Sequence, residues 1–396
     1  MRTINLLIIL LSALRMPAQW SPVRFNSDIT TACFATARDT CFVTGDKGKI
    51  FRTTNGGIAW DSVQTVFKTS WFLDIHFPSK NTGYACGGTA FGSHKSMVAK
   101  TLDGGQTWDS IASGLFGYDL SAIYFLDNNT GFIGALGAII KTTDGGQTFI
   151  VDTLPAFGSV KKFCFPSGNT GYAASAKLVI RTTDQGVNWS VVHTDTSAIN
   201  SVYFVNASTG FAVGDKGVLL RTNNGGAGWN RTLITGDTLC LQDVKFITNS
   251  EGYIAASRWQ GSRGYIYKTI DGGNNWVLQY TSATHPFTAI SMVSPGSGYA
   301  AGYSGVNRLT PVTNSLLEED ETSGLVFFPN PVSGYLSVRA GGLFDFFIYD
   351  CEGRPVSFEM INNCSGIDTS KFPAGLYTLM AVERSGCVHT GKFVKE

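Results

Sequence analysis

Short segments in which apolar and polar residues alternate recur along most of the chain, for example at 201–205 and 243–247. A period of two is the pattern of a β-strand that buries one face. Each segment is followed by a turn signal ending in Gly-Tyr or Gly-Phe, a second strand-like run, another turn and a third run. The pattern therefore predicts a unit of four short strands that is repeated along the chain.

A nine-residue phrase closes these units and marks their period. It consists of a basic residue, a threonine, an Asp or Asn, one or two glycines and a final aromatic residue, as at 100–108. A repeat of about 40 residues with four strands is typical of a β-propeller blade. The phrase occurs six times, beginning at Arg52, Lys100, Lys141, Arg181, Arg221 and Lys268.

The last repeat indicates how the ring closes. Residues 287–310 hold three strand-like runs and Arg308, but neither the glycine turn nor the closing aromatic residue. The missing strand is present at 19–25, where Trp20 takes the place of that aromatic residue. A ring of sheets leaves no open edge when its first strand completes its last blade. Six complete units and one split unit predict an all-β fold, a seven-bladed β-propeller followed by a small C-terminal β-sandwich.

The repeated phrase contains two sets of residues with a predicted structural role. An Asp or Asn side chain at a tight turn accepts backbone N–H bonds from its own loop, and the glycines supply positive φ. A metal site would need converging ligands, whereas these turns point away from one another around a ring, so we expect no metal, cofactor or catalytic residue among them. The turn residues are Asn55, Asp103, Asp144, Asp184, Asn224 and Asp271, and the aromatic residues expected to pack between blades are Trp20, Trp60, Trp108, Phe149, Trp189, Trp229 and Trp276.

Composition and charge exclude some classes of partner and compartment. Thirty basic and 29 acidic residues leave the chain nearly neutral, which disfavours nucleic acid and anionic membranes as partners. Residues 1–18 combine Arg2 with an apolar run at 6–11 and predict a secretory signal. Arg15 shortens the apolar run below the ~20 residues of a membrane-spanning helix. We expect Sec export, periplasmic transit and no transmembrane segment in the mature chain, which we expect to be a monomer.

The eight cysteines do not form an obvious disulfide framework. Cys33, Cys86 and Cys164 fall inside strands of different repeats, and buried thiols of this kind behave as small apolar side chains. Cys41 follows Cys33 across a predicted hairpin, and alternation places the two on opposite faces. The remaining possibility is a bond within the C-terminal cluster of Cys351, Cys364 and Cys387, whose pairing the sequence leaves open.

On these motifs, the propeller region resembles the Asp-box (BNR-like) propellers of the photosystem II stability and assembly factor-like family. The phrase Thr-x-Asp-x-Gly-x-Thr-Trp at 101–108 carries the resemblance. The resemblance implies a seven-bladed ring over 19–312. Sialidases and other glycoside hydrolases also carry Asp-boxes, but the arginine cluster and Tyr/Glu pair of a sialidase are not evident. We expect a non-enzymatic protein and keep a divergent sialidase-like glycoside hydrolase as the alternative.

The C-terminal region resembles a second family. Phe328-Pro329-Asn330-Pro331 opens it, a Gly-Leu-Tyr strand follows at 375–377, and a lysine-containing strand ends it. These residues are similar to those of the type IX secretion sorting domain (Por secretion tail) of Bacteroidetes, here 326–396, joined by a polar linker at 313–325. The resemblance implies recognition by the type IX machinery and a secreted or surface-attached product. A carbohydrate-binding module is the alternative for such a sandwich.

The predicted binding face is formed by the loops between blades and the loops between second and third strands. Blades two and six carry the long insertions on this face. Aromatic and arginine side chains together are typical of recognition surfaces, although loop-length variation alone could also place them there. The candidates are Trp71, His94, Tyr118, Arg258, Trp259, Arg263 and His285. We therefore expect a binding, scaffold or adhesion module for an unidentified protein or glycan.

Overall fold

The computed structural model describes two compact units, one spanning Ala18–Pro311 and one containing Val312–Glu396. The described residues are 19–23, 30–68, 70–89, 96–113, 119–153, 158–234, 239–258, 262–303, 305–310, 326–328, 332, 335–339, 343–350, 355–362, 365–383 and 388–395. All regular elements within these ranges are β-strands, and none of this part of the chain forms a helix that could cross a membrane. The predicted signal, the linker and the three C-terminal cysteines lie outside the described residues.

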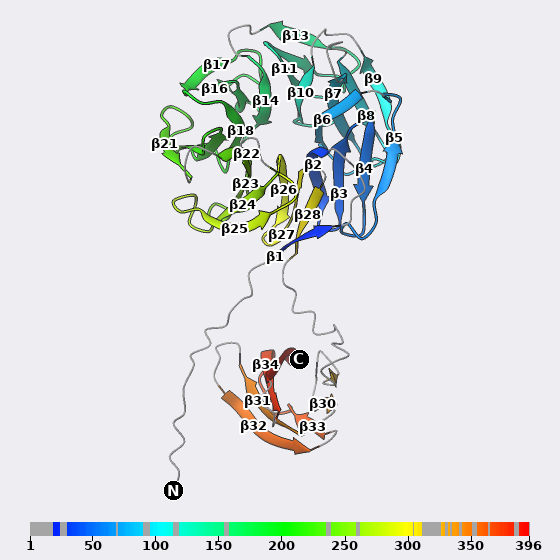
Figure 1. The fold of residues 1–396 in the computed structure, drawn as a ribbon, viewed down its shortest axis with the longest axis vertical. Helices are drawn as coiled ribbons and strands as arrows, with labels where there is room; N and C mark the ends of the chain where they lie inside the picture. The colour runs from blue at the N-terminus through cyan, green and yellow to red at the C-terminus, as the bar shows by residue number, and fades with distance from the viewer. Residues whose placement is uncertain are drawn as a thin grey trace. The chain divides into compact units, whose positions relative to one another are not determined.

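Seven four-stranded antiparallel sheets build the first unit and stand around a common centre (Figure 1). From the innermost strand outward, blade 1 is β2 (Thr30–Ala37), β3 (Thr40–Gly45), β4 (Lys49–Thr53) and β5 (Asp61–Gln64). Blade 2 is β6 (Ser70–His76), β7 (Gly83–Thr89), β8 (Met97–Thr101) and β9 (Asp109–Ser113); blade 3 is β10 (Leu120–Phe125), β11 (Gly131–Ala135), β12 (Ala138–Thr142) and β13 (Ile150–Thr153). Blade 4 is β14 (Val160–Cys164), β15 (Gly171–Ser175), β16 (Leu178–Thr182) and β17 (Ser190–Thr194); blade 5 is β18 (Ile199–Phe204), β19 (Gly210–Gly214), β20 (Val218–Thr222) and β21 (Asn230–Leu233). Blade 6 is β22 (Leu239–Phe246), β23 (Gly252–Arg258), β24 (Gly264–Thr269) and β25 (Val277–Ser282).

The seventh blade closes the ring with a strand from the other end of the unit. It consists of β26 (Ala289–Ser294), β27 (Ser297–Gly302), β28 (Gly305–Thr310) and β1 (Gln19–Val23). β1 pairs antiparallel with β28, so that Trp20 lies opposite Leu309. The predicted seven-bladed, all-β fold and its closure are confirmed.

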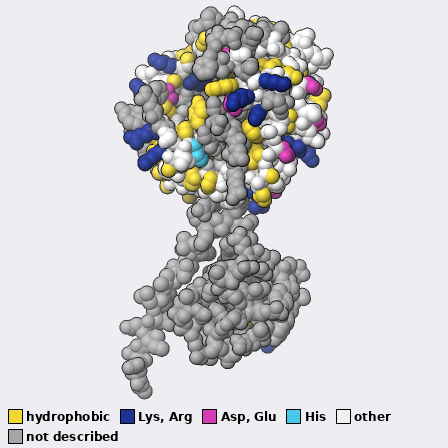
Figure 2. Space-filling view, turned by 45° about the vertical axis from the view of Figure 1, so that its right-hand side comes forward, with side chains coloured by type: hydrophobic (Ala, Val, Ile, Leu, Met, Phe, Trp, Pro, Cys, Tyr) yellow, Lys and Arg dark blue, Asp and Glu magenta, His cyan; other side chains and the backbone are white. Residues whose placement is uncertain are grey.

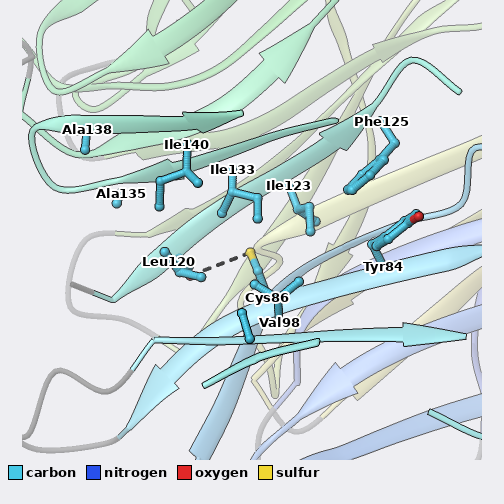
Figure 3. Close-up of a cluster of buried hydrophobic side chains, with 11 residues drawn as sticks. Tyr84, Cys86, Val98, Leu120, Ile123, Phe125, Ile133, Ala135, Ala138 and Ile140 are labelled. Carbon is cyan, nitrogen blue, oxygen red and sulfur yellow. Dashed lines mark hydrogen bonds between the residues drawn. The ribbon is translucent and has the colours of Figure 1, made fainter. Parts of the chain in front are cut away.

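Apolar side chains fill the spaces between neighbouring blades. Figure 3 shows one such cluster, in which Cys86 and Val98 of blade 2 face Leu120 and Ile133 of blade 3. Six further clusters of the same kind lie between the other pairs of neighbours. Because both faces of every blade are covered, the second strand of each blade is buried along nearly its whole length rather than at alternate residues. Each of the seven closing aromatic residues contacts one of these clusters: Trp20, Trp60, Trp108, Phe149, Trp189, Trp229 and Trp276.

A basic residue and an aromatic residue connect blade 2 to blade 3. Lys100 lies opposite Tyr84 in blade 2, with its Nζ 5.2 Å from the centre of the tyrosine ring. Both side chains continue into blade 3: Lys100 donates to the carbonyl of Gly145 (2.9 Å), and the Tyr84 hydroxyl donates to that of Asn128 (2.8 Å). We call this arrangement the blade latch. A basic side chain also lies over the aromatic ring in blades 3 to 7, and this contact accounts for the Gly-Tyr/Phe signal occurring together with the Lys/Arg-Thr phrase.

Five cysteines within the described residues carry free thiols and are buried. One expectation about them is wrong. Cys33 lies opposite Val43, and Cys41 is two residues from Val43 on the same strand, so Cys33 and Cys41 share one face and one apolar cluster. The register pairs Cys33 with Val43 and Ala35 with Cys41, so ordinary alternation puts both cysteines on the same side once the pairing is known. Burial raises the pKa of the Cys33 thiol to about 12, so it stays protonated and unreactive.

The described residues of the C-terminal unit form seven strands in two sheets. β29 (Val326–Phe328), β30 (Tyr335–Arg339) and β33 (Ser365–Asp368) form a three-stranded sheet. The other sheet has the order β32-β31-β34-β35, from β31 (Leu343–Tyr349), β32 (Pro355–Asn362), β34 (Gly375–Glu383) and β35 (Val388–Lys395). Leu336, Ile348, Ile367 and Leu379 are buried, which places an apolar core beneath both sheets.

Candidate binding face and central channel

The innermost strand of five blades carries a β-bulge at the same place, near its first residue. The register shifts in β6, β10, β14, β18 and β22 fall at Leu73, Ser121, Lys161, Asn200 and Gln242. A bulge inserts one extra residue and re-aims its side chain. All five residues line a cavity of about 170 Å³ in the central channel, together with Thr31 of blade 1 and Thr288 of blade 7.

Polar side chains at this level link every inner strand to its neighbour. Asp74 Oδ2 accepts the N–H of Ile123 (3.0 Å), and Asp243 Oδ2 accepts that of Ile290 (3.2 Å). The remaining links join Thr31 to the carbonyl of Phe72, Ser121 to that of Val160, Lys161 to the side chain of Asn200, Asn200 to the carbonyl of Leu241, and Thr288 to that of Thr31. A continuous series of hydrogen bonds between neighbouring inner strands therefore surrounds the narrow part of the channel.

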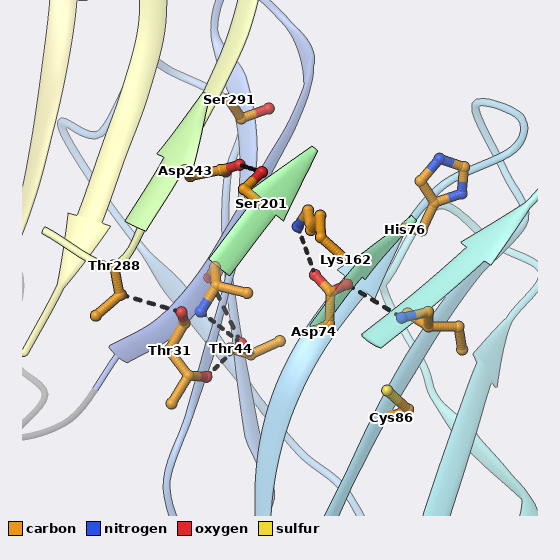
Figure 4. Close-up of polar contacts among 12 residues, drawn as sticks. Thr31, Thr44, Asp74, His76, Cys86, Lys162, Ser201, Asp243, Thr288 and Ser291 are labelled. Carbon is orange, nitrogen blue, oxygen red and sulfur yellow. Dashed lines mark hydrogen bonds and ion pairs between the residues drawn. The ribbon is translucent and has the colours of Figure 1, made fainter. Parts of the chain in front are cut away.

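Lys162 connects blades that are not neighbours (Figure 4). Its Nζ lies 3.2 Å from Asp74 Oδ1, so a side chain of blade 4 reaches blade 2 across the channel. Asp243 of blade 6 accepts a hydrogen bond from Ser201 (2.7 Å). Although burial opposes its charge, the carboxylates of Asp74 and Asp243 hold the pKa of Lys162 above its ordinary value. Lys162 stays protonated, and its positive charge offsets the buried carboxylates.

The imidazole of His76 lies beside this charged group (Figure 4). Burial, then the positive charges of Lys162 and Lys245, lower the pKa of His76 to about 3. His76 Nδ1 accepts the backbone N–H of Phe125 at 3.3 Å. The imidazole is therefore neutral at physiological pH and acts as a packing and hydrogen-bonding group.

A second, wider hollow of about 510 Å³ opens over blades 4, 5 and 6. Three of its residues, Lys161, Asn200 and Gln242, also line the channel cavity, so the two spaces lie next to each other. The other lining residues are Asp215, Cys240, Ser257 and Arg258. They lie at the starts of inner strands and in the connections between second and third strands, which is the face chosen from the sequence.

The structure places the predicted face residues in different surroundings. Arg258 is exposed at the end of β23 and lines the hollow, and Arg263 is exposed nearby, with its carbonyl accepting the N–H of Arg258 (3.3 Å). Trp71 is half-buried in β6. His285 is 7% exposed and its Nε2 bonds to Asn307 (2.7 Å), so this side chain is not available on the surface. His94, Tyr118 and Trp259 lie outside the described residues.

Sequence reasoning identified Arg258 but missed Lys161, Asn200 and Gln242. These three residues follow the inter-blade loops, and their aim depends on bulges that the apolar pattern does not encode. A signal was present, however. Each of these residues is followed by a second polar residue, Lys162, Ser201 or Asp243, where strict alternation would place an apolar one.

The repeated turn residues make hydrogen bonds within their own loops. Asp103 Oδ1 accepts the backbone N–H groups of Gln106 and Thr107 (2.9 Å each) and the hydroxyl of Thr101 (2.8 Å). The bonds from Thr107, first its hydroxyl and then its N–H, lower the pKa of Asp103 to about 2. Asn55, Asp144, Asp184, Asn224 and Asp271 each accept the same threonine hydroxyl and loop N–H bonds. Within the described ranges, no three His, Cys, Asp or Glu side chains come together as a metal site would require.

On the visible part of the described propeller surface, charged side chains form no continuous field. Figure 2 shows lysine and arginine side chains as separate groups among uncharged ones on the visible part of the described surface. This distribution agrees with the near-zero net charge.

Two family comparisons match different parts of the chain. Residues 187–300 match the family described as photosynthesis system II assembly factor YCF48, and residues 326–396 match the secretion system C-terminal sorting domain. No curated protein matches the chain. A sorting domain indicates export to the cell surface or the outside of the cell.

Solved structures similar to the chain are propellers with different roles. YCF48 bound to a D1 peptide is 18% identical with a TM-score of 0.60, covering 75% of this chain and 98% of that one. YCF48 from Cyanidioschyzon merolae is 17% identical (TM-score 0.61; 74% and 99% covered), and a streptogramin B lyase is 14% identical (TM-score 0.63; 76% and 99% covered). At these identities the likeness shows the fold alone. The chain thus combines a propeller domain like that of the photosynthesis system II assembly factor YCF48 with a secretion system C-terminal sorting domain.

Proposed function

We propose that this protein is an exported, non-enzymatic propeller that binds a protein segment or a glycan on the face where the hollow opens. The observation that carries the proposal is the hollow itself. It is about 510 Å³, within the range of small-ligand sites, and its lining residues come from three blades. The similar propeller YCF48 binds a D1 peptide, which supports a binding role for a propeller of this fold.

The C-terminal unit supports a route by which the protein is exported. We propose that the sorting domain directs the chain through the type IX machinery after Sec export and periplasmic transit, and that the propeller then acts as a monomer in solution or on the surface. Photosystem assembly does not carry over to this chain, because a sorting domain places the propeller outside the cell.

The alternative, a divergent glycoside hydrolase, needs two carboxyl groups about 5–10 Å apart that can exchange protons. Asp74 and Asp243 are the channel carboxylates, and both accept bonds from backbone N–H groups and from Lys162 or Ser201. Asp195, in the connection between β17 and β18, accepts bonds from Arg231 and the Ser197 N–H (3.0 and 2.8 Å). Carboxylates held by such bonds favour a binding role over a hydrolytic one.

The test is a screen of the mature full chain against a glycan array and a peptide library, followed by titration of the hits. We expect Arg258→Ala to weaken binding about tenfold, the effect of losing one charge-assisted hydrogen bond. Lys80→Ala is the control, because Lys80 is exposed in the turn between β6 and β7, on the opposite face. Unchanged binding by Arg258→Ala would contradict the choice of this face, and release of shortened glycan would establish hydrolysis.

A further inference from the structure

The hollow over blades 4 to 6 has a fixed polar wall. Asn200 Oδ1 accepts a hydrogen bond from the Lys161 ammonium (2.7 Å), and its Nδ2 donates to Asp215 (2.8 Å) and to the carbonyl of Leu241 (3.0 Å). Burial and the nearby Asp215 raise the pKa of the Cys240 thiol to about 11, so this sulfur stays protonated. The Lys161 ammonium is thereby held in position before any ligand arrives, which reduces the entropy lost on binding.

The groups that remain for a ligand are mostly hydrogen-bond donors. A lysine ammonium has three N–H bonds, and Asn200 takes one of those of Lys161. Arg258 is exposed at the rim of the hollow and brings up to five more donors. Asp215 is the one carboxylate of the wall, and Asn200 already engages it. Two cations against one engaged carboxylate favour a ligand with a negative group.

The rest of the lining indicates what carries that negative group. Gln242 donates to Ser257 (3.0 Å), which leaves its amide oxygen as an acceptor and the Ser257 hydroxyl as a donor. An apolar peptide side chain would need an apolar wall, and among the lining residues only Cys240 could provide one. Side-chain amides and hydroxyls beside charged groups instead suit a sugar ring, which carries several hydroxyls. A hollow of about 510 Å³ has room for one or two sugar rings.

We propose that the hollow binds an acidic sugar, with its anionic group between Lys161 and Arg258 and its hydroxyls on Gln242, Ser257 and Asp215. The proposal rests on the binding role proposed above and names the ligand of that site. The anionic group is a carboxylate, as in a uronate, or a sulfate ester, since both accept charge-assisted bonds from lysine and arginine.

The experiment titrates the mature full chain with four probes: a tetragalacturonate, its methyl ester, a sulfated disaccharide and an acidic hexapeptide. We expect an acidic sugar to bind and the neutral ester to bind at least tenfold more weakly. Comparison of the uronate and sulfate probes identifies the anionic group. Lys161→Met and Arg258→Ala should each weaken binding of that probe about tenfold, whereas Arg258→Lys should retain part of the affinity.

The matched control is Lys177→Ala. Lys177 is exposed in the turn between β15 and β16, on the same face but outside the hollow. An equal loss in this control would mean general charge attraction and would overturn the proposal, as would equal binding of the methyl ester. Tighter binding of the hexapeptide, lost in Arg258→Ala, would overturn the acidic-sugar proposal and leave the binding role standing. If none of the four probes binds, and the glycan array and the peptide library give no hits, both the acidic-sugar proposal and the proposed binding role are rejected.

Discussion

At the residue scale, the repeated turns show which part of a side chain matters. Asn55 and Asn224 occupy the same position as Asp103 and accept the same threonine hydroxyl through Oδ1 (3.0 and 2.8 Å). A neutral amide oxygen is therefore sufficient to form the loop. The second glycine of the phrase is less replaceable: at Gly105, with φ of 78°, an added Cβ would lie 2.3 Å from the ring of Phe42 in the preceding blade. The turn is a packing element between blades as well as a chain reversal.

Substitutions at Asp103 distinguish two contributions of this side chain to stability: the hydrogen bonds that it accepts in the loop and its negative charge. Because the folded pKa of about 2 lies below the ordinary 3.8, this carboxylate contributes stability above about pH 4 that is lost as the pH falls through 2. We expect Asp103→Asn to keep the fold and to reduce the loss of stability between pH 4 and 2. Asp103→Ala should be less stable than Asp103→Asn at neutral pH. Denaturant unfolding of the three proteins at several pH values measures both effects, and identical pH profiles for wild type and Asp103→Asn would contradict the assignment.

At the element scale, the blade is well encoded in the sequence, but its links to the next blade are not. The period of the phrase predicts four strands and their turns, because those depend on local patterns of apolar residues and glycine. The blade latch joins Lys100 to a carbonyl 45 residues away. A backbone carbonyl is present in every residue, so no residue type in blade 3 marks it as the acceptor. The acceptor of the Lys100 hydrogen bond can be identified only from the folded propeller.

The latch can be tested with one hydroxyl. Tyr84 is fully buried as a residue, and its ring stacks on Phe125 of blade 3 with centroids 3.5 Å apart. We expect Tyr84→Phe to lower the free energy of unfolding by about 1 kcal/mol, the net value of one hydrogen bond. Tyr84→Ala should cost about 3–5 kcal/mol through the cavity it leaves. Phe132 occupies the same position in blade 3 and has no hydroxyl, so Phe132→Ala is the control for the loss of packing without a hydrogen bond. If Tyr84→Phe alone had a large effect, the hydrogen bond rather than the packing would dominate the contact.

At the scale of the whole molecule, the ring and the sorting unit could be predicted, whereas the interior of the channel could not. The counts of repeats and the split last unit indicate seven blades and a closing strand. The pair of Lys162 and Asp74 joins blades 4 and 2 across the ring, and its members are 88 residues apart with no motif around either. Their meeting depends on the width of the channel and on the inner-strand bulges. The same holds for the hollow, which is built from isolated polar residues of three blades.

Ring closure by β1 leads to a prediction about the whole unit. Trp20 is 2% exposed, its Nε1 donates to Gln279 (3.2 Å), and its ring meets Tyr253 of blade 6 edge-on at 6.2 Å. Trp20→Ala should cost about 3–5 kcal/mol, and removal of this anchor should weaken the pairing of β1 with β28. If the strand holds the ring shut, hydrogen exchange should accelerate in blades 7 and 1, on both sides of the closure. Trp276→Ala removes an indole side chain between blades 5 and 6, away from the point where the two ends of the propeller meet. It should accelerate hydrogen exchange only in blades 5 and 6. Faster exchange confined to β1 itself would mean that contacts between blades close the ring without the strand.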